Sequence, residues 1–287
     1  MTTRARAFAL AAALALLGSG CERVVDLDLE PGPVRLVIEG GVRRPVSGTD
    51  STQTIRLTTT DQLTSDRPPP PVRGALVEVS DEQGHTWRFA EDEPGIYRAR
   101  FWPVVGERYR LRIEVDGERY EGSDVVSAVP PIDSLYFEFE ESNIAVGDEG
   151  FRAAIDYRDP AGVENYYLWE QLIDGESSLT PDPGNRFRVI GDDNFIDGAR
   201  ITAYQPYDEA IVEPGQTVVV RQVALSERSY RWLFALFEQS GDGQGSIFSV
   251  PPASVRGNVA NLTNPEHYPL GYFLAAEVAE ARATLAP

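Results

Sequence analysis

The 287-residue chain contains one cysteine and no lysine, and these two absences exclude several kinds of chemistry. A single cysteine can neither form a disulfide within the chain nor supply a cluster of thiolates to a metal ion. Schiff-base catalysis by a lysine amine is also excluded. We therefore expect packed apolar cores, rather than cross-links, to hold the fold together.

Histidine is nearly as scarce, since only His85 and His267 are present. Neither belongs to an HxxxH or HExxH motif, the spacings that direct two imidazoles at one metal ion. The chain has no Gly-x-Ser-x-Gly motif, and its glycine-rich segment 241–245 lacks the lysine of a phosphate-binding loop. We therefore expect a protein that is not an enzyme and needs no cofactor. A glycosidase with paired carboxylates stays open as an alternative, because a chain with 45 acidic residues always contains such pairs.

Positive charge is in short supply as well. The chain has 26 basic residues against 45 acidic ones, which gives a formal net charge of −19. Such a charge repels nucleic acids and anionic lipid headgroups. We expect neither to be a partner of this protein.

The single cysteine stands at the end of a leader that is organised like a secretion signal. Arg4 and Arg6 precede an apolar run over 8–17, and the small residues 18–20 then lead to Cys21. The apolar run is too short to span a bilayer, whereas acyl chains on a cysteine anchor a protein stably. The sequence therefore predicts a lipoprotein that is attached to its membrane by lipid.

We accordingly assign residues 1–20 to a lipoprotein signal peptide and residues 21–33 to a lipidated polar tether that begins at Cys21. One position departs from the usual lipoprotein signal, which has leucine three residues before the cysteine. Here Gly18 occupies that position. An ordinary secretory leader, cleaved nearby, is the alternative.

Short segments of alternating apolar and polar residues begin at residue 34. The clearest spans 109–115, in which Leu111 and its apolar neighbours alternate with charged residues. One apolar and one polar face are typical of a strand in an antiparallel sheet. Asp116-Gly117 follows directly and indicates a tight β-hairpin. We predict an N-terminal Ig-like β-sandwich domain over 34–130.

The alternation resumes after the Val-Pro-Pro sequence that ends at residue 131, and we expect a second, β-rich domain over 131–287. Strands are expected at 135–139, 151–157, 165–172, 186–190, 201–204, 217–224 and 270–278. One helix is expected over about 226–240, with Ser226 as its N-cap and an apolar stripe at helical spacing. The alanine-rich residues after 278 give no pattern. The predicted fold class is mainly β: two Ig-like or transthyretin-like antiparallel β-sandwich domains, the second carrying one amphipathic helix.

One acidic loop has the composition of a metal site. Asp192, Asp193 and Asp197 offer hard oxygen ligands of the kind that calcium prefers. The loop lacks the spacing of an EF-hand, so a turn in which the side chains bond to their own backbone is the preferred interpretation. Asp156, Asp159 and Glu164 form a second acidic group, which we also interpret as part of a turn.

Aromatic residues supply the candidates for an interface. Most of them should lie in the core. We expect Trp102, Tyr204 and Tyr207 to be exposed, because Trp102 lies at the edge of a strand and the two tyrosines flank Pro206.

A set of short motifs also occurs in a fixed order along the whole chain. They are residues 21–29, 36–40, 74–77, 95–97, 109–111, 129–135, 159–160, 165–167, 193–198, 257–259 and 271–273. In this order they resemble the lipoprotein family known as domain of unknown function 4249. The resemblance implies a cell-envelope lipoprotein of Gram-negative bacteria that works beside a TonB-dependent outer-membrane receptor, and it implies no known reaction.

We therefore expect an outer-membrane lipoprotein, anchored through Cys21, that acts as a non-enzymatic accessory or binding component of such a receptor. The alternative is an independent surface protein that binds a glycan or another ligand.

Overall fold

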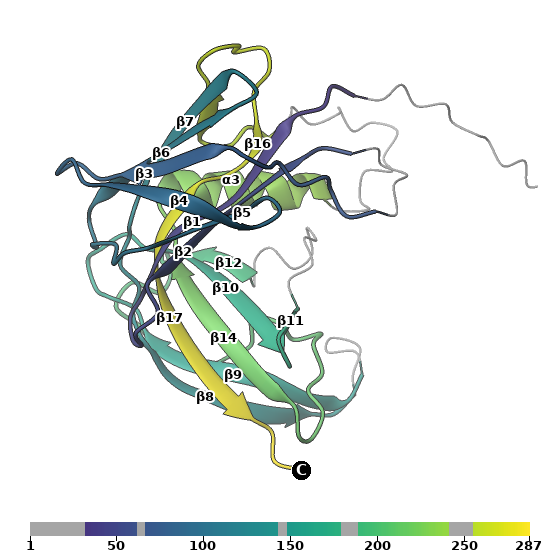
Figure 1. Ribbon diagram of the computed structural model, residues 1–287. Helices are drawn as coiled ribbons and strands as arrows, with labels where there is room; N and C mark the ends of the chain where they lie inside the picture. The colour runs from purple at the N-terminus through teal and green to yellow at the C-terminus, as the bar shows by residue number, and fades with distance from the viewer. Residues whose placement is uncertain (1–31, 62–66, 143–147, 179–188, 241–254) are drawn as a thin grey trace, which may run out of the picture. The chain divides into compact units, whose positions relative to one another are not determined.

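Strands dominate the described part of the chain and one helix accompanies them, so the protein is mainly β, as predicted (Figure 1). The computed structural model describes residues 32–61, 67–142, 148–178, 189–240 and 255–287. The predicted signal peptide, Cys21 and most of the tether lie outside these ranges. In chain order the elements are β1 (Leu36–Pro45), β2 (Thr52–Thr59), β3 (Leu76–Ser80), β4 (Thr86–Glu93), β5 (Ile96–Arg100), β6 (Arg108–Val115), β7 (Glu118–Val125), β8 (Ile132–Glu140), β9 (Gly150–Arg158), β10 (Tyr166–Ile173), β11 (Glu176–Ser177), β12 (Ile190–Asp192), β13 (Arg200–Tyr204), β14 (Thr217–Ala224), α3 (Glu227–Ser240), β15 (Val259–Asn261), β16 (Leu270–Gly271) and β17 (Leu274–Thr284).

The first seven strands enclose one apolar core. The first half of β4 pairs with β3 and its second half pairs with β5, so β4 passes from one layer of the sandwich to the other. As a result β1, β2 and β5 contribute to the core from one layer, and β3, β6 and β7 from the other. The fully buried members of this core are Ile38, Val42, Ile55, Leu57, Val77, Val79, Leu111, Ile113, Val126, Phe273 and Ala275. Two facing layers around one core make this part a β-sandwich, as the alternating pattern predicted.

The hairpin between β6 and β7 follows directly from its sequence. Asp116 and Gly117 have φ angles of 52° and 78°, and a type I′ turn requires positive values at both central residues. The two strands pair without a break from Arg108 opposite Val125 to Val115 opposite Glu118. This turn fixes the register that places Leu111 inside and Arg110 outside.

A second core lies between two layers in the later part of the chain. Strands β10, β14 and β17 form one layer, and the three-stranded sheet β13-β9-β8 forms the other. Trp169, Val218, Val220 and Ile155 are among the side chains buried between them. The opposite face of β10 and β14 is also covered, which explains why β14 is apolar along most of its length.

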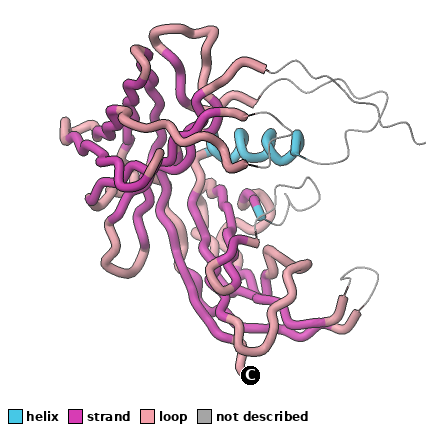
Figure 2. Tube along the Cα trace, turned by 45° about the vertical axis from the view of Figure 1, so that its right-hand side comes forward, coloured by secondary structure: helices cyan, strands magenta, loops and turns pink. Residues whose placement is uncertain are grey.

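That opposite face is covered by α3, the helix that the sequence predicts (Figure 2). Ser226 caps it as expected, since the backbone N–H of Ser229 donates to the Ser226 Oγ at 3.1 Å. Phe237 is buried in a third apolar cluster, and Tyr230, Leu233 and Phe234 pack against that cluster. Its other members include Leu168 of β10, Val223 of β14 and Val278 of β17. Among the described residues, no helix is long and apolar enough to cross a membrane.

The last strand is longer than expected. We predicted a strand over 270–278, but β16 is a two-residue strand and β17 continues to Thr284 through the alanine-rich residues. There β17 pairs antiparallel with β14, from Val278 opposite Val223 to Thr284 opposite Thr217. Alanine is neither strongly apolar nor polar, so the alternation of these residues gives little signal, although Ala279 is buried and Ala281 and Ala283 are half-buried.

Strand β1 pairs with β16 and β17 in parallel, whereas all other paired strands in the described ranges are antiparallel. Two parallel strands need a long connection between them. β1 and β17 meet this requirement because they come from opposite ends of the described chain. Gly271 makes the join close: its φ is +86°, and a Cβ at this position would lie 1.9 Å from the carbonyl oxygen of Ile38. Only glycine fits there.

The structure forms a single compact unit from Val34 to Pro287. The predicted division at residue 130 falls inside this unit, where β1 pairs with β17 and β7 pairs with β15. Whether residues 34–130 fold without the later strands stays a prediction.

Candidate functional site

Trp102 is exposed, as predicted, on the connection between β5 and β6. Its exposed fraction is 46%, and Val104 and Val105 on the same connection are 52% and 37% exposed. The buried ring of Phe101 stacks on Trp87 at 4.0 Å, and the N–H of Val104 donates to the hydroxyl of Tyr109 at 2.9 Å. The connection is therefore fixed to the core while it presents three apolar side chains to solvent. We call Trp102, Val104 and Val105 the Trp102 loop.

The two tyrosines expected beside it behave differently. Tyr207 is only 7% exposed, so the prediction that it is exposed is wrong. Its ring belongs to the third apolar cluster, and its hydroxyl donates to the carbonyl oxygen of Trp169 at 2.8 Å. Tyr204 is half-buried, and the centroid of its ring lies 4.7 Å from that of the Trp169 ring. Both tyrosines therefore stabilise the second part of the chain and do not offer an exposed aromatic platform.

Two of the three candidate metal ligands lie together, and a third aspartate joins them. Carboxylate oxygens of Asp159, Asp193 and Asp197 all lie within 4.8 Å of one another. Asp192 is not part of this group, because it accepts a hydrogen bond from the Tyr230 hydroxyl at 3.1 Å instead. Neighbouring residues on a strand point to opposite faces, so Asp192 and Asp193 diverge at the end of β12. We call Asp159, Asp193 and Asp197 the aspartate cluster.

Each carboxylate of the aspartate cluster is held by protein donors. The contacts are Tyr167 hydroxyl to Asp159 Oδ1 at 2.6 Å, Gly198 N–H to Asp159 Oδ2 at 3.1 Å, Asn165 N–H to Asp193 Oδ2 at 2.9 Å and Gly162 N–H to Asp197 Oδ1 at 2.6 Å. These contacts tie the turn after β9 to the loop after β12. The sequence offered the two acidic groups separately, and only the fold brings Asp159 to the other two.

The electrostatics of the aspartate cluster are unfavourable for an isolated group of anions. Burial raises the pKa of Asp193, and the neighbouring carboxylates of Asp159 and Asp197 raise it further. The pKa of Tyr167 is raised by burial and by its hydrogen bond to Asp159. In the described ranges, no arginine forms an ion pair with these carboxylates; Arg200, which follows the loop, instead lies 3.9 Å from an oxygen of Asp156.

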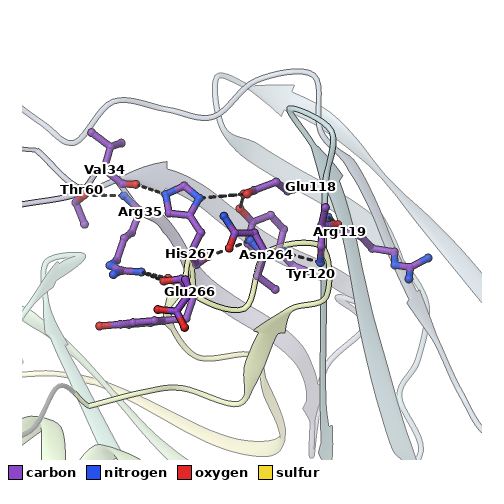
Figure 3. Close-up of polar contacts among 12 residues, drawn as sticks. Val34, Arg35, Thr60, Glu118, Arg119, Tyr120, Asn264, Glu266 and His267 are labelled. Carbon is purple, nitrogen blue, oxygen red and sulfur yellow. Dashed lines mark hydrogen bonds and ion pairs between the residues drawn. The ribbon is translucent and has the colours of Figure 1, made fainter.

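The two histidines each pair with a carboxylate in different parts of the fold. His85 Nδ1 lies 2.7 Å from Asp81 in the turn before β4. His267 Nδ1 lies 3.1 Å from Glu118, and its Nε2 lies 2.8 Å from the carbonyl oxygen of Val34 (Figure 3). Figure 3 also shows Arg35 reaching the same loop. His267 thus helps to hold Val34, which directly follows the predicted tether in sequence, against the loop before β16.

A pocket of about 380 Å³ lies beside α3, and its lining is unusual for so acidic a chain. The lining includes three arginines, Arg228, Arg231 and Arg256, together with the rings of Trp232 and Tyr272. Those two rings lie 4.9 Å apart. The guanidinium of Arg256 also lies 4.0 Å above the ring of Tyr268. We call this the arginine pocket. The sequence pattern of α3 indicated its apolar stripe but did not indicate the arginine-lined pocket beside it.

Comparison with known proteins supports the resemblance that the ordered motifs carry. No curated protein matches the chain. A family model described as "Domain of unknown function (DUF4249)" matches residues 22–282, which is nearly the whole chain. The match begins one residue after Cys21 and includes the Trp102 loop, the aspartate cluster and the arginine pocket. The chain therefore belongs to the DUF4249 family.

Proposed function

We propose that this protein is a non-enzymatic accessory component that is anchored to the outer membrane by lipid on Cys21 and binds a TonB-dependent receptor. The leader sequence supports the anchor, and the chain's resemblance to a family of envelope lipoproteins supports the location. The receptor is the partner that this resemblance implies.

The Trp102 loop is the observation that carries the binding role. Three apolar side chains are exposed together on a chain whose formal net charge is −19. A few aromatic and apolar side chains at the centre of an interface usually supply most of its binding energy. Because the loop is already held by Phe101 and Tyr109, little conformational entropy would be lost when it binds.

Co-purification tests this proposal. The native lipoprotein is extracted from outer membranes in detergent, and receptors bound to it are identified. We expect a TonB-dependent receptor to co-purify with the wild type and to be lost with Trp102→Ser. Phe139→Ser is a matched control, because Phe139 is also an exposed aromatic residue, at 55%, but lies on β8. Equal recovery with all three proteins would contradict a role for the Trp102 loop.

The anchor has its own test. Cys21→Ser removes the thiol that would be acylated, so we expect the variant to lose acyl labelling and to leave the membrane fraction. An unlabelled wild type, together with a variant that stays in the membrane, would contradict the lipoprotein assignment.

The arginine pocket favours a second candidate, an independent surface protein that binds a ligand. Guanidinium groups bind carboxylates and phosphates, and aromatic rings stack on sugars, so an acidic glycan suits the lining. If this is the function, the purified protein is retained on an acidic polysaccharide column and Arg256→Gln is not. Retention that is independent of Arg256, or none at all, would contradict it.

A further inference from the structure

The aspartate cluster joins two parts of the chain that are distant in sequence. Asp159 follows β9, whereas Asp193 and Asp197 belong to the loop after β12. Asp159 is 1% exposed and Asp193 is 4% exposed, so two of the three carboxylates are withdrawn from water. Carboxylates so close together repel one another, and burial removes their hydrating water. A cation bound between them would offset both costs.

The spacing of the oxygens fits a calcium ion. Calcium binds oxygen ligands at about 2.3–2.6 Å, so ligands on opposite sides of the ion are roughly 5 Å apart. The carboxylate oxygens of the aspartate cluster lie within 4.8 Å of one another, inside that limit. The N–H and O–H donors that hold these carboxylates also fix their positions before any ion binds, as second-shell donors do in metal sites.

Asn165 provides an independent observation that points to the same ligand. It is 8% exposed, and its side-chain oxygen Oδ1 is buried with no hydrogen-bond partner. A buried amide oxygen without a donor is costly, unless something in the native protein satisfies it. Amide oxygen is a normal calcium ligand.

The strand register places the side chain of Asn165 on the same face of the ladder as that of Asp193. Tyr166 is opposite Asp192 in the β10–β12 ladder, so Asn165 is opposite Asp193, and the N–H of Asp193 donates to the carbonyl oxygen of Asn165 at 3.2 Å. Opposite residues in an antiparallel ladder project to the same face. Tyr167, two residues further along β10, projects to that face too, and its hydroxyl reaches Asp159.

We propose that Asp159, Asp193, Asp197 and the side-chain oxygen of Asn165 bind one calcium ion. Water completes the coordination, because calcium takes six to eight oxygens. The ion ties the turn after β9 to the loop after β12 and thereby stabilises the second part of the chain. This inference is independent of the receptor proposed above.

Titration of the full mature chain with calcium chloride, after removal of divalent ions, tests the proposal. We expect one calcium ion per chain by calorimetry and a melting temperature that rises with calcium concentration, because an ion that binds only the folded state stabilises it by mass action. Magnesium chloride should bind more weakly, since Mg²⁺ demands a smaller, octahedral shell.

Three variants locate the site. Asp197→Asn changes an exposed residue and should fold, yet weaken calcium binding by at least about tenfold, because the ligand charge falls. Asn165→Ala should lower calcium affinity without lowering the melting temperature in the absence of calcium, since Oδ1 has no partner to lose. Asp192→Asn, which changes the adjacent carboxylate outside the aspartate cluster, is the control and should bind calcium like the wild type.

Two results would overturn the proposal. One is a wild type with neither calcium heat nor a melting shift. The other is an Asp192→Asn variant that loses as much affinity as Asp197→Asn, which would indicate nonspecific attraction to an acidic surface.

Discussion

Leu111 is a residue whose place in the fold follows from its neighbours in sequence. It is fully buried in the first core, between the exposed Arg110 and Arg112. Leu111→Ala should lower the free energy of unfolding by about 2–5 kcal/mol, because it removes buried methyl groups and leaves a cavity. Urea denaturation checks this, with Arg110→Ala as the control, expected to change stability by less than about 0.5 kcal/mol. Equal effects of the two variants would contradict the assigned faces of β6.

Gly271 is the residue that makes the parallel join possible, and Gly106 is its matched control. The two have nearly equal φ angles, +86° and +85°, but a Cβ at Gly106 would meet open space. Gly106→Ala should therefore cost only backbone strain, about 1–3 kcal/mol. Gly271→Ala adds a collision with the backbone of Ile38 and should cost clearly more. Thermal unfolding compares the two variants, and equal losses would argue against the close approach of β1 and β16.

Asp159 shows where reasoning from single residues ends. The sequence pattern placed Asp193 and Asp197 in one acidic loop, where their carboxylates do lie together, but it grouped them with Asp192 and placed Asp159 in a separate turn. Strand alternation explains why the side chain of Asp192 points away from the aspartate cluster. Asp159 lies beside Asp193 and Asp197 only because strands distant in sequence pair with one another, and no local pattern encodes that pairing.

At the scale of elements, α3 and its cap were predictable because the signal is local. Ser226→Ala should lower the free energy of unfolding by about 0.5–2 kcal/mol, since it leaves the N–H of Ser229 without its acceptor. Ser226→Thr keeps the hydroxyl and should recover most of that loss. Chemical denaturation measures both variants. An alanine variant as stable as the wild type would contradict the cap.

Strands β15 and the end of β17 were not predictable for a different reason. β15 has three residues, too few for an alternation to stand out, and the end of β17 is rich in alanine. Their positions are set by partners, β7 and β14, that are far away in sequence. Alternation therefore predicted which residues of β3 and β6 are buried, but not that β14 is covered on both faces, nor which strand lies next to which.

At the scale of the whole molecule, the later strands complete the first sandwich. Val259, Phe273 and Ala275 belong to the first core although they come from the end of the chain. A fragment of residues 34–130 lacks these side chains and leaves the edges of β1 and β7 unpaired. We expect it to fold into β structure, because its own strands supply both layers, but to unfold at a lower urea concentration than the full chain. Circular dichroism that shows a disordered fragment would contradict this expectation.

The proposed receptor-binding role assigns the contact to the Trp102 loop, and site-specific cross-linking in the intact cell envelope tests it most directly. The chain has no lysine, so amine-reactive reagents would miss the complex. A photo-reactive amino acid in place of Trp102, with Phe139 replaced in the same way as the control, labels whatever contacts each position. We predict that position 102 captures a TonB-dependent receptor in intact cells and position 139 does not. Capture of no receptor at position 102, combined with micromolar binding of an acidic glycan by the purified protein, would contradict the accessory role and favour an independent ligand-binding protein.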